Sequence, residues 1–152
     1  MLVKDAMCKD VKTCTKDSSV KDIATTMCFN KISGLPVVDG DELVGIVSEK
    51  DVLCSMFPDM KELVDSGAKP DFEEMENDYL SVLDKSVSDI MTTVVATVSP
   101  DMPILRAASM MWLRKIRRIP VTDGNKLVGI LSMGDVHKQI FQETLMSPAN
   151  SQ

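Results

Sequence analysis

The chain contains an internal repeat, and this repeat constrains its fold more than any other feature of the sequence. Aligned without gaps at an offset of 84 residues, residues 3–57 match residues 87–141 at 22 of 55 positions. Such self-similarity indicates two copies of one supersecondary unit, each too small to bury its own hydrophobic face. We therefore expect two repeats that share one core.

The spacing of apolar residues predicts the same elements in each repeat. A β-rich run, at 11–15 and again at 94–98, precedes an amphipathic helix whose apolar residues recur at i, i+3, i+4, i+7 and i+8. The predicted apolar stripes are Val20, Ile23, Ala24, Met27 and Cys28, and Ile104, Ala107, Ala108, Met111 and Trp112.

Capping and turn residues set the limits of these elements. Ser19 with Asp22 resembles a capping box, whereas Asp101 is expected to cap the matching helix, with Pro103 in its first turn. The first repeat then continues with strands at 35–38 and 43–47, joined by an Asp-Gly turn that strongly favours a hairpin. A last helix completes a β-α-β-β-α unit.

The repeat and the charge distribution divide the chain into four parts. We expect repeat 1 at 1–57, a connector at 58–84, repeat 2 at 85–146 and a flexible tail at 147–152. The connector carries nine acidic and two basic residues, and it includes a predicted helix from Asp71 to Leu83. The connector thus contributes most of the net charge of −6.

Composition argues against several classes of protein. The longest uncharged stretch, 90–100, is far shorter than the ~20 residues of a membrane span, and the first residues do not resemble a signal peptide. We therefore expect a cytoplasmic protein. Aromatic residues at 4% and the negative charge argue against nucleic-acid binding. We expect no metal site, because the single His137 is remote in sequence from the four cysteines, which form no C-x-x-C pair.

A Gly-h-h-Ser-x-x-Asp motif, in which h is an apolar residue, ends each hairpin. It includes Ser48 and Asp51 in the first repeat, and Ser132 and Asp135 in the second. The motif places a hydroxyl, free backbone N–H groups and a carboxylate where a strand enters a helix. Two interpretations remain open: the side chains simply cap the helix, or they form part of a nucleoside site, because helix N-termini attract phosphate and a carboxylate accepts ribose hydroxyls.

The complete pattern resembles a tandem pair of CBS domains, known as a Bateman module. The resemblance covers both repeats, about three-quarters of the chain. It implies an α/β (α+β) fold in which two β-α-β-β-α repeats pack sheet to sheet with pseudo-twofold symmetry. Members of this family often dimerise. They bind adenosine-containing ligands (AMP, ADP, ATP, sometimes S-adenosylmethionine) in clefts between the repeats.

The resemblance further implies two crossed ligand sites. The first would combine Ser132 and Asp135 with Thr13, Ile32, Ser33, Gly34, Leu35 and Pro36. The second would combine Ser48 and Asp51 with Thr97, Ile116, Arg117, Arg118, Ile119 and Pro120.

The two sites differ at one pair of positions. Where the first repeat has Ser33-Gly34, the second has Arg117-Arg118. A guanidinium pair favours a polyanionic ligand. Two alternatives remain: a solvated basic face, or an electrostatic contact with the acidic connector of a partner subunit.

These observations predict a stand-alone regulatory sensor of adenosine-containing ligands. We expect no enzyme and no catalytic cofactor, because the chain has no recognisable catalytic motif. The alternatives are a constitutive adaptor or dimerisation module without ligand, and a thiol- or metal-responsive regulator. We also expect an unidentified regulated protein and a homodimer. The residues expected in the dimer contact are Met27, Phe29, Met111, Trp112 and Leu113.

Overall fold

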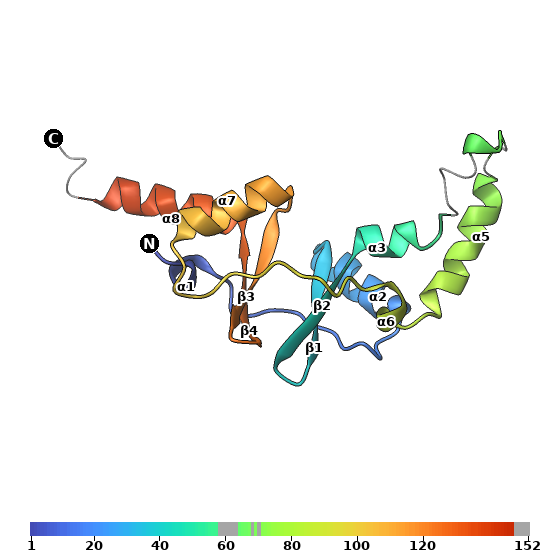
Figure 1. Cartoon of the computed structure of the whole chain (residues 1–152), viewed down its shortest axis with the longest axis horizontal. Coiled ribbons are helices and arrows are strands. Elements are labelled where there is room, and N and C mark those ends of the chain that lie inside the picture. Colours follow the sequence, from blue (N-terminus) through green and yellow to red (C-terminus); the bar gives the residue numbers. More distant parts are fainter. Residues whose placement is uncertain (58–63, 68, 70, 148–152) are drawn as a thin grey trace. The chain divides into compact units, whose positions relative to one another are not determined.

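The computed structural model describes residues 1–57, 64–67, 69 and 71–147, and Figure 1 shows its elements in chain order. The helices are α1 (Val3–Ala6), α2 (Val20–Asn30), α3 (Glu49–Cys54), α5 (Phe72–Leu83), α6 (Val87–Ile90), α7 (Ile104–Arg114) and α8 (Met133–Met146). The strands are β1 (Gly34–Asp39), β2 (Glu42–Ser48), β3 (Arg118–Asp123) and β4 (Lys126–Ser132). Residues 58–63, 68 and 70 of the expected connector, and 148–152 of the expected tail, lie outside the described residues.

The strands confirm both predicted hairpins and the α/β class. Gly40 and Gly124 adopt φ of 60° and 62° in the two turns, a conformation that glycine reaches without steric cost. Strands β3 and β4 pair antiparallel from Arg118–Ser132 to Asp123–Lys126, with an irregularity after Val121. The sheet order is β1-β2-β4-β3, and Glu42 at the start of β2 pairs with Lys126.

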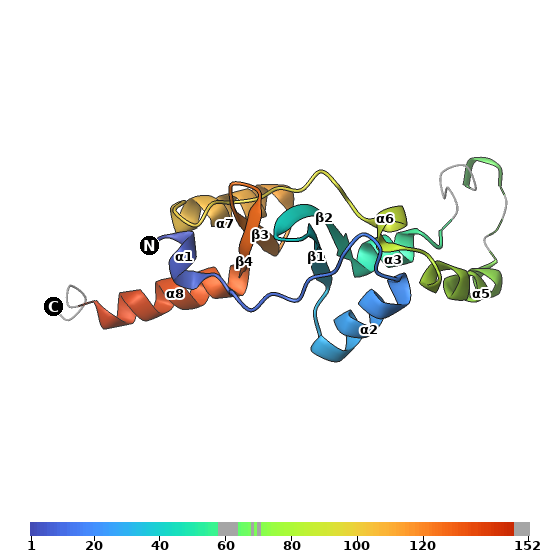
Figure 2. The ribbon, with the colours of Figure 1, turned by 90° about the horizontal axis from the view of Figure 1, so that it is seen from below.

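Packing divides the chain into two compact units that do not coincide with the two repeats. Unit 1 contains Met1–Val11, Asp41–Leu43 and Ala96–Gln152, and unit 2 contains Lys12–Gly40 and Val44–Val95. In unit 1, α1 packs against α7 and α8 (Figures 1 and 2). Each unit is therefore the body of one repeat, completed by the short helix that begins the other repeat.

The two cores show this exchange at equivalent positions. The first core contains Cys14, Val20, Ile23, Met27, Leu35, Val37, Val47, Val52, Val82 and Val87. The second contains Val3, Val98, Ile104, Ala107, Met111, Ile119, Val121, Leu131 and Val136. Apart from Val82 of α5, the two sets correspond position by position at the offset of 84. The exchange concerns one pair: Val87 of the second repeat lies in the first core, and Val3 of the first repeat lies in the second core. The expected boundaries at 57, 84 and 146 thus follow the sequence repeat, not the packing units.

The predicted β-rich runs form single bridges rather than strands. Cys14 bridges Val37 and Val98 bridges Val121, both in parallel. To extend either ladder toward the N-terminus, the residue before Val37 or Val121 would have to donate a backbone hydrogen bond. Those residues are Pro36 and Pro120, which lack the N–H. Proline therefore limits the pairing.

The start of α2 agrees with its predicted cap, whereas that of α7 does not. The Ser19 hydroxyl accepts a hydrogen bond of 3.1 Å from the Asp22 amide. Expecting Asp101 to cap α7 was wrong: Pro103 is the N-cap residue and has no side-chain cap. Instead, the Asp101 carboxylate forms an ion pair with Lys4, with 3.1 Å between Asp101 Oδ1 and Lys4 Nζ.

The buried part of each helical stripe ends after about two turns, at Met27 and Met111, and the next stripe residue is exposed. Met27 and Met111 are core residues at 2% and 0% exposure. Cys28 and Trp112, expected in the same stripes, are exposed. Met27 and Met111 are therefore buried within their own units and are not available for the dimer contact in which they were expected.

A glycine in each hairpin allows the exchanged segment to approach the sheet. A Cβ atom at Gly45 would lie 2.9 Å from the Thr92 carbonyl oxygen, and one at Gly129 would lie 2.9 Å from the Cys8 carbonyl oxygen. Backbone bridges form beside both contacts, between Ile46 and Thr92 and between Cys8 and Ile130. These glycines are needed for packing and not for turn geometry.

Replacing either packing glycine with alanine should destabilise the fold. We expect Gly129→Ala and Gly45→Ala each to cost about 1–3 kcal/mol, because the new methyl group overpacks a backbone contact. Gly134→Ala is the matched control: its Cβ meets nothing closer than 3.7 Å, and it lies in α8, where alanine is favoured by about 1 kcal/mol. Urea unfolding measures all three. Equal stability of G129A and G134A would contradict the packing role.

Candidate functional site

The Ser-Asp pair of the first repeat forms a complete capping box at the start of α3. The Asp51 amide donates to Ser48 Oγ at 3.3 Å. In return, Asp51 Oδ2 accepts from the Ser48 amide at 2.9 Å and from the Ser48 hydroxyl at 3.1 Å. Both residues are half-buried. The capping interpretation of the motif is thus confirmed.

The second repeat builds the same box at the start of α8, with one difference. The Asp135 amide donates to Ser132 Oγ at 3.0 Å, and Asp135 Oδ2 accepts from the Ser132 amide at 3.0 Å. Within the described residues the Ser132 hydroxyl donates to no carboxylate, unlike that of Ser48, and Oδ1 of Asp51 and of Asp135 accepts no hydrogen bond. Each box therefore leaves acceptor capacity at one edge of its unit.

The strand-start segments lie beside these boxes within each unit. In unit 2, the Ser33 carbonyl oxygen accepts from the Glu49 amide at 2.9 Å. In unit 1, the Arg117 carbonyl oxygen accepts from the Met133 amide at 2.9 Å. The structure thus brings Ser33 to the first box and Arg117 to the second, each within its own repeat.

The two predicted threonines, Thr13 and Thr97, lie beside the strand-start segments of their own units. Thr13 precedes Cys14, whose amide donates to the Pro36 carbonyl oxygen at 3.0 Å. Thr97 precedes Val98, whose amide donates to the Pro120 carbonyl oxygen at 3.1 Å. Thr13 is exposed and Thr97 half-buried, so both threonines stand next to the predicted segment of their own unit.

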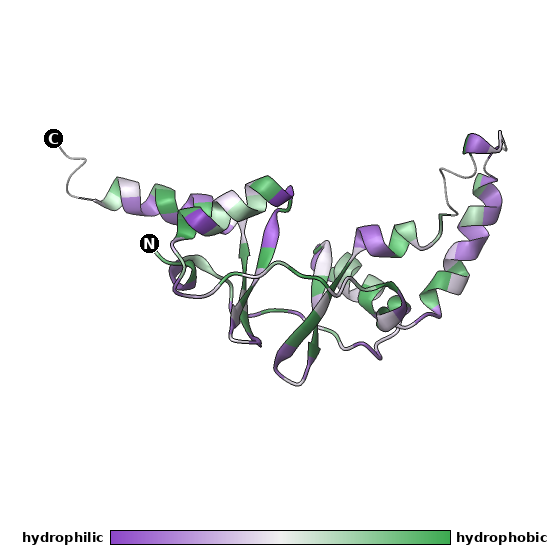
Figure 3. Cartoon of the chain, in the orientation of Figure 1, coloured by the Kyte–Doolittle hydropathy of each residue, from purple (hydrophilic) through white to green (hydrophobic). Residues whose placement is uncertain are grey.

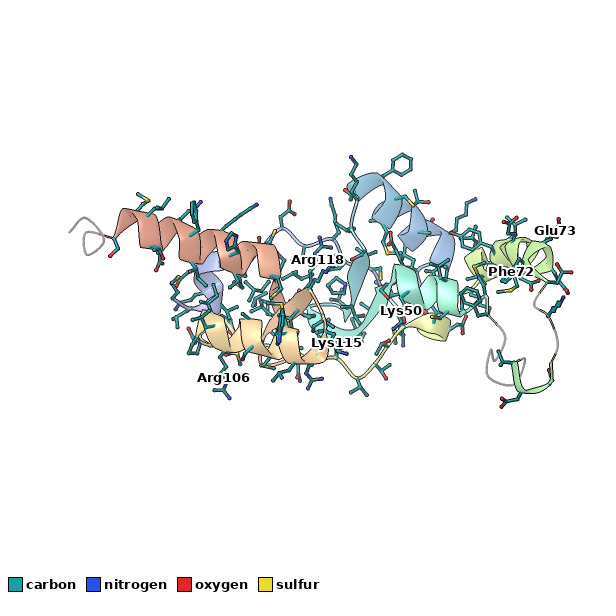
Figure 4. The ribbon with its side chains drawn as sticks, turned by 90° about the horizontal axis from the view of Figure 1, so that it is seen from above. Lys50, Phe72, Glu73, Arg106, Lys115 and Arg118 are labelled. Atoms are coloured by element: carbon teal, nitrogen blue, oxygen red, sulfur yellow. The ribbon has the colours of Figure 1, made fainter. Side chains whose placement is uncertain are left out.

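The predicted segments mix accessible and buried side chains. Leu35, Pro36, Ile119 and Pro120 are buried, so a ligand would reach the backbone of these residues. Ser33, Ile116, Arg117 and Arg118 are exposed, and Ile32 and Gly34 are half-buried. In Figure 4, Arg118 projects from the start of β3. The pairing of each segment with the box of the other unit, as the crossed sites require, stays a prediction.

Each unit also has a groove beside a pair of packed helices, α2 and α3 in unit 2 and α7 and α8 in unit 1. The first groove, in unit 2, has a volume of about 220 Å³ and is lined by Ala24, Met27, Cys28, Glu49, Val52, Leu53 and Tyr79. The second groove, in unit 1, has a volume of about 490 Å³ and is lined by Met111, Trp112, Lys115, Ile116, Arg117 and Met133. Three lining positions correspond at the offset of 84: Met27 with Met111, Cys28 with Trp112 and Glu49 with Met133.

The second groove combines two predicted site residues, Ile116 and Arg117, with residues that the sequence interpretation did not assign to a ligand site. Trp112 was expected on the apolar stripe and in the dimer contact, and neither Lys115 nor Met133 was a predicted site residue. The signal available in the sequence was the repeat itself, because Met133 replaces the charged Glu49 and Trp112 replaces Cys28. Both replacements enlarge the apolar surface of the second groove relative to the first.

The cysteines fall into two environments. Cys8, Cys28 and Cys54 are exposed, whereas Cys14 is buried. Burial raises the pKa of the Cys14 thiol from 9.0 to about 11. Among the residues that the structure describes, no three His, Cys, Asp or Glu side chains gather closely enough to hold a metal ion. No described helix has both the length and the apolar character needed to cross a membrane.

The comparisons with known proteins agree with this architecture. A family model described as "CBS domain" matches residues 3–57 and 87–141. The chain belongs to the CBS domain family. This CBS pair is 36% identical over 151 residues to the uncharacterized protein MJ1426 of Methanocaldococcus jannaschii, a match that covers 90% of this chain and 89% of that one. It is also 34% identical over 139 residues to the chloroplastic protein CBSX2 of Arabidopsis thaliana, covering 82% of this chain and 56% of the relative.

Solved structures of other CBS pairs superpose on most of the chain. The crystal structure of CBSX2 in complex with AMP has a TM-score of 0.72 at 30% identity, covering 94% of this chain and 98% of that one. The CBS domain pair of protein MJ0100 was solved in complex with 5′-methylthioadenosine and S-adenosyl-L-methionine. It has a TM-score of 0.67 at 26% identity and covers the same shares of the two chains, 94% and 98%. The family predicted from the repeat is therefore confirmed.

The thiol environments predict a graded reactivity. At pH 8 iodoacetamide should modify Cys8, Cys28 and Cys54 in the native protein and leave Cys14 unmodified, because the thiolate is the nucleophile and the pKa of Cys14 is raised. Intact mass would show three adducts, and a fourth after unfolding. Burial favours the neutral thiol, so its contribution to stability is complete below about pH 9 and is lost as the pH rises through about 11. Rapid addition of a fourth adduct to the native protein would contradict this assignment.

Proposed function

We propose that this CBS pair is a regulatory module that binds adenosine-containing ligands, with AMP, ADP, ATP and S-adenosylmethionine as the candidates. The observation that carries the proposal is the free Oδ1 of Asp51 and Asp135, held at the edge of each unit by a half-buried capping box. A fixed carboxylate oxygen with spare capacity is a good acceptor for ribose hydroxyls. The solved CBS pairs with AMP, and with 5′-methylthioadenosine and S-adenosyl-L-methionine, support this ligand class.

The proposal uses two crossed sites. The box of Ser132 and Asp135 would hold ribose and phosphate against Thr13 and residues 32–36. The box of Ser48 and Asp51 would act with Thr97 and residues 116–120. The start of α8, which has 14 residues, favours an anion through the helix dipole, although the amides of Met133 and Asp135 already donate to Arg117 and Ser132. The shorter α3, with six residues, offers less of this effect.

Regulation would follow from the coupling of two units by one ligand. A ligand that contacts residues of both units stabilises the arrangement of the units that it fits best. The size of the response is set by the difference in affinity between arrangements. A partner protein that recognises one arrangement would then sense the ligand.

Asparagine variants test the ribose role without removing the cap. Asp135→Asn and Asp51→Asn keep an oxygen that can accept the serine amide, but the other carboxylate oxygen becomes an NH₂ donor. We expect each to weaken one site by about 1.5–3 kcal/mol, or ~10–150-fold, the value of a charged hydrogen bond. Calorimetry with AMP, ADP, ATP and S-adenosylmethionine measures the loss.

The matched control is Asp89→Asn, because Asp89 Oδ2 accepts from the Ser86 amide at 3.0 Å in an equivalent box outside the site. Wild-type protein should bind 2′,3′-dideoxy analogues more weakly by a similar factor. Equal affinity for ribose and dideoxy ligands would rule out the ribose role of both aspartates.

The arginine pair should set a preference for phosphate. In the described part of the chain, neither Arg117 nor Arg118 is paired with an acidic side chain, so both are free to contact an anion. We expect Arg117→Ser with Arg118→Gly, the residues of the first repeat, to reduce the preference for ATP over adenosine by about tenfold, or ~1–2 kcal/mol. Its salt dependence should fall as well.

A control variant, Lys85→Ser with Lys126→Ser, removes the same charge outside the predicted segments. Calorimetry at two salt concentrations compares both variants with the wild type. If the arginine variant keeps the full ATP preference and salt slope, these arginines contact solvent or protein and not phosphate.

A further inference from the structure

The two grooves differ in what covers them. In unit 2, α5 packs against α2, and its Tyr79 lines the first groove. Met75 and Val82 lie on the same side of α5 as Tyr79 and are buried at 8% and 3% exposure. The second groove is lined by α7, the turn after it and the first residue of α8. A helix of this chain therefore covers the first groove, and no third helix among the described residues lines the second.

The helix on the first groove is amphipathic and acidic. Met75, Tyr79 and Val82 form its inner side, and Figure 3 shows hydrophilic and hydrophobic residues alternating along it. Glu76 and Asp78 lie at the edges of the inner side, and α5 contains no basic residue. The first copy of the groove thus accepts an acidic helix that carries an aromatic residue on its inner side.

The second groove suits an acidic helix better than the first does. Its described lining includes Lys115 and Arg117 and no acidic residue, whereas the first groove has Glu49 and no basic residue. Figure 4 places Lys115 at the end of α7. Met133 stands where the first repeat has Glu49, and Trp112 adds a large apolar surface that is 75% exposed. Both differences favour an occupant that is acidic and partly apolar.

The first groove also differs from the second in how its occupant is held. A segment of the same chain has a high effective concentration, so α5 needs few contacts to stay in place. A helix of another protein lacks this advantage and needs more apolar contact and complementary charge. The second groove offers both, with a volume of about 490 Å³ against about 220 Å³ for the first.

We propose that the second groove is a docking site for an acidic amphipathic helix of a partner protein. The helix would pack an aromatic residue on Trp112 and Ile116. Its acidic side chains would lie beside Lys115 and Arg117. A second copy of this chain does not offer such a helix, because the inner side of its α5 is buried in its own unit 2. The site consists of residues of unit 1 alone, and it does not depend on the ligand sites.

A peptide with the sequence of α5 is the probe, because it has the chemistry of the first occupant. Residues 71–84 would carry a hydrocarbon staple between positions 73 and 77, away from the inner side, since isolated helices of this length are marginal in water. In the full chain α5 already covers the first groove, so the peptide should bind the second. Trp112 is the single tryptophan. Saturating peptide, added without nucleotide, should shift its emission to shorter wavelength and reduce its quenching by iodide.

Two changes disrupt the expected contact from opposite sides. In the chain, Met133→Glu introduces the residue of the first repeat and places a negative charge in the groove. In the peptide, Glu76→Lys with Asp78→Lys reverses the charge beside the inner side. Each should weaken binding at least about tenfold, because like charges then approach each other. The matched control is Phe141→Glu, which adds the same charge at an exposed position of α8 outside the groove and should bind like the wild type.

Three results would overturn the proposal. The first is an unchanged Trp112 spectrum at millimolar stapled peptide. The second is equal peptide affinity of the wild type and Met133→Glu; if this variant does not fold, equal affinity for the charge-reversed peptide decides in the same way. The third is a Trp112 side chain that is protected from iodide in the free chain and loses this protection on dilution. A second copy would then occupy the groove, as the dimer contact expected from the sequence requires.

Discussion

The fold depends on the exchange of two short segments between the repeats. Val3 and Val87 occupy equivalent sequence positions, yet Val3 is buried in the core with β3 and β4, and Val87 in the core with β1 and β2. The exchange requires backbone to approach backbone at Gly45 and Gly129, where no side chain fits. Neither repeat alone contains all the residues of a core, so each unit requires a segment from both repeats.

The same serine and aspartate serve both the fold and the proposed site. Capping uses the serine Oγ and one carboxylate oxygen, and it fixes the rotamer of each aspartate at a strand-to-helix junction. A second carboxylate oxygen then has a defined direction before any ligand arrives. Preorganised acceptors of this kind lose little entropy on binding. The capping and ligand interpretations of the motif are therefore compatible, because they use different atoms.

The two repeats differ at residues of the proposed ligand sites and of the two grooves. Their cores correspond position by position, but Ser33-Gly34 became Arg117-Arg118, and Cys28 became Trp112. The connector helix α5 adds to the difference, since it packs against α2 in unit 2 and carries acidic residues. The two proposed ligand edges therefore differ in charge, and the two grooves differ in apolar surface.

The sequence by itself determined the repeat, both hairpins, the apolar faces of α2 and α7, the helix of the connector and the capping of α3 and α8. These features depend on local spacing, on Asp-Gly turns and on Ser-x-x-Asp pairs, whose physics acts within a few residues. The tertiary structure decided what depends on distant neighbours. It exchanged α1 and α6, limited the 11–15 and 94–98 runs to single bridges opposite Pro36 and Pro120, and turned Asp101 from a cap into a partner of Lys4. It also left Trp112 on the surface, because burial depends on which segment packs over a helix face, and local spacing cannot specify that segment.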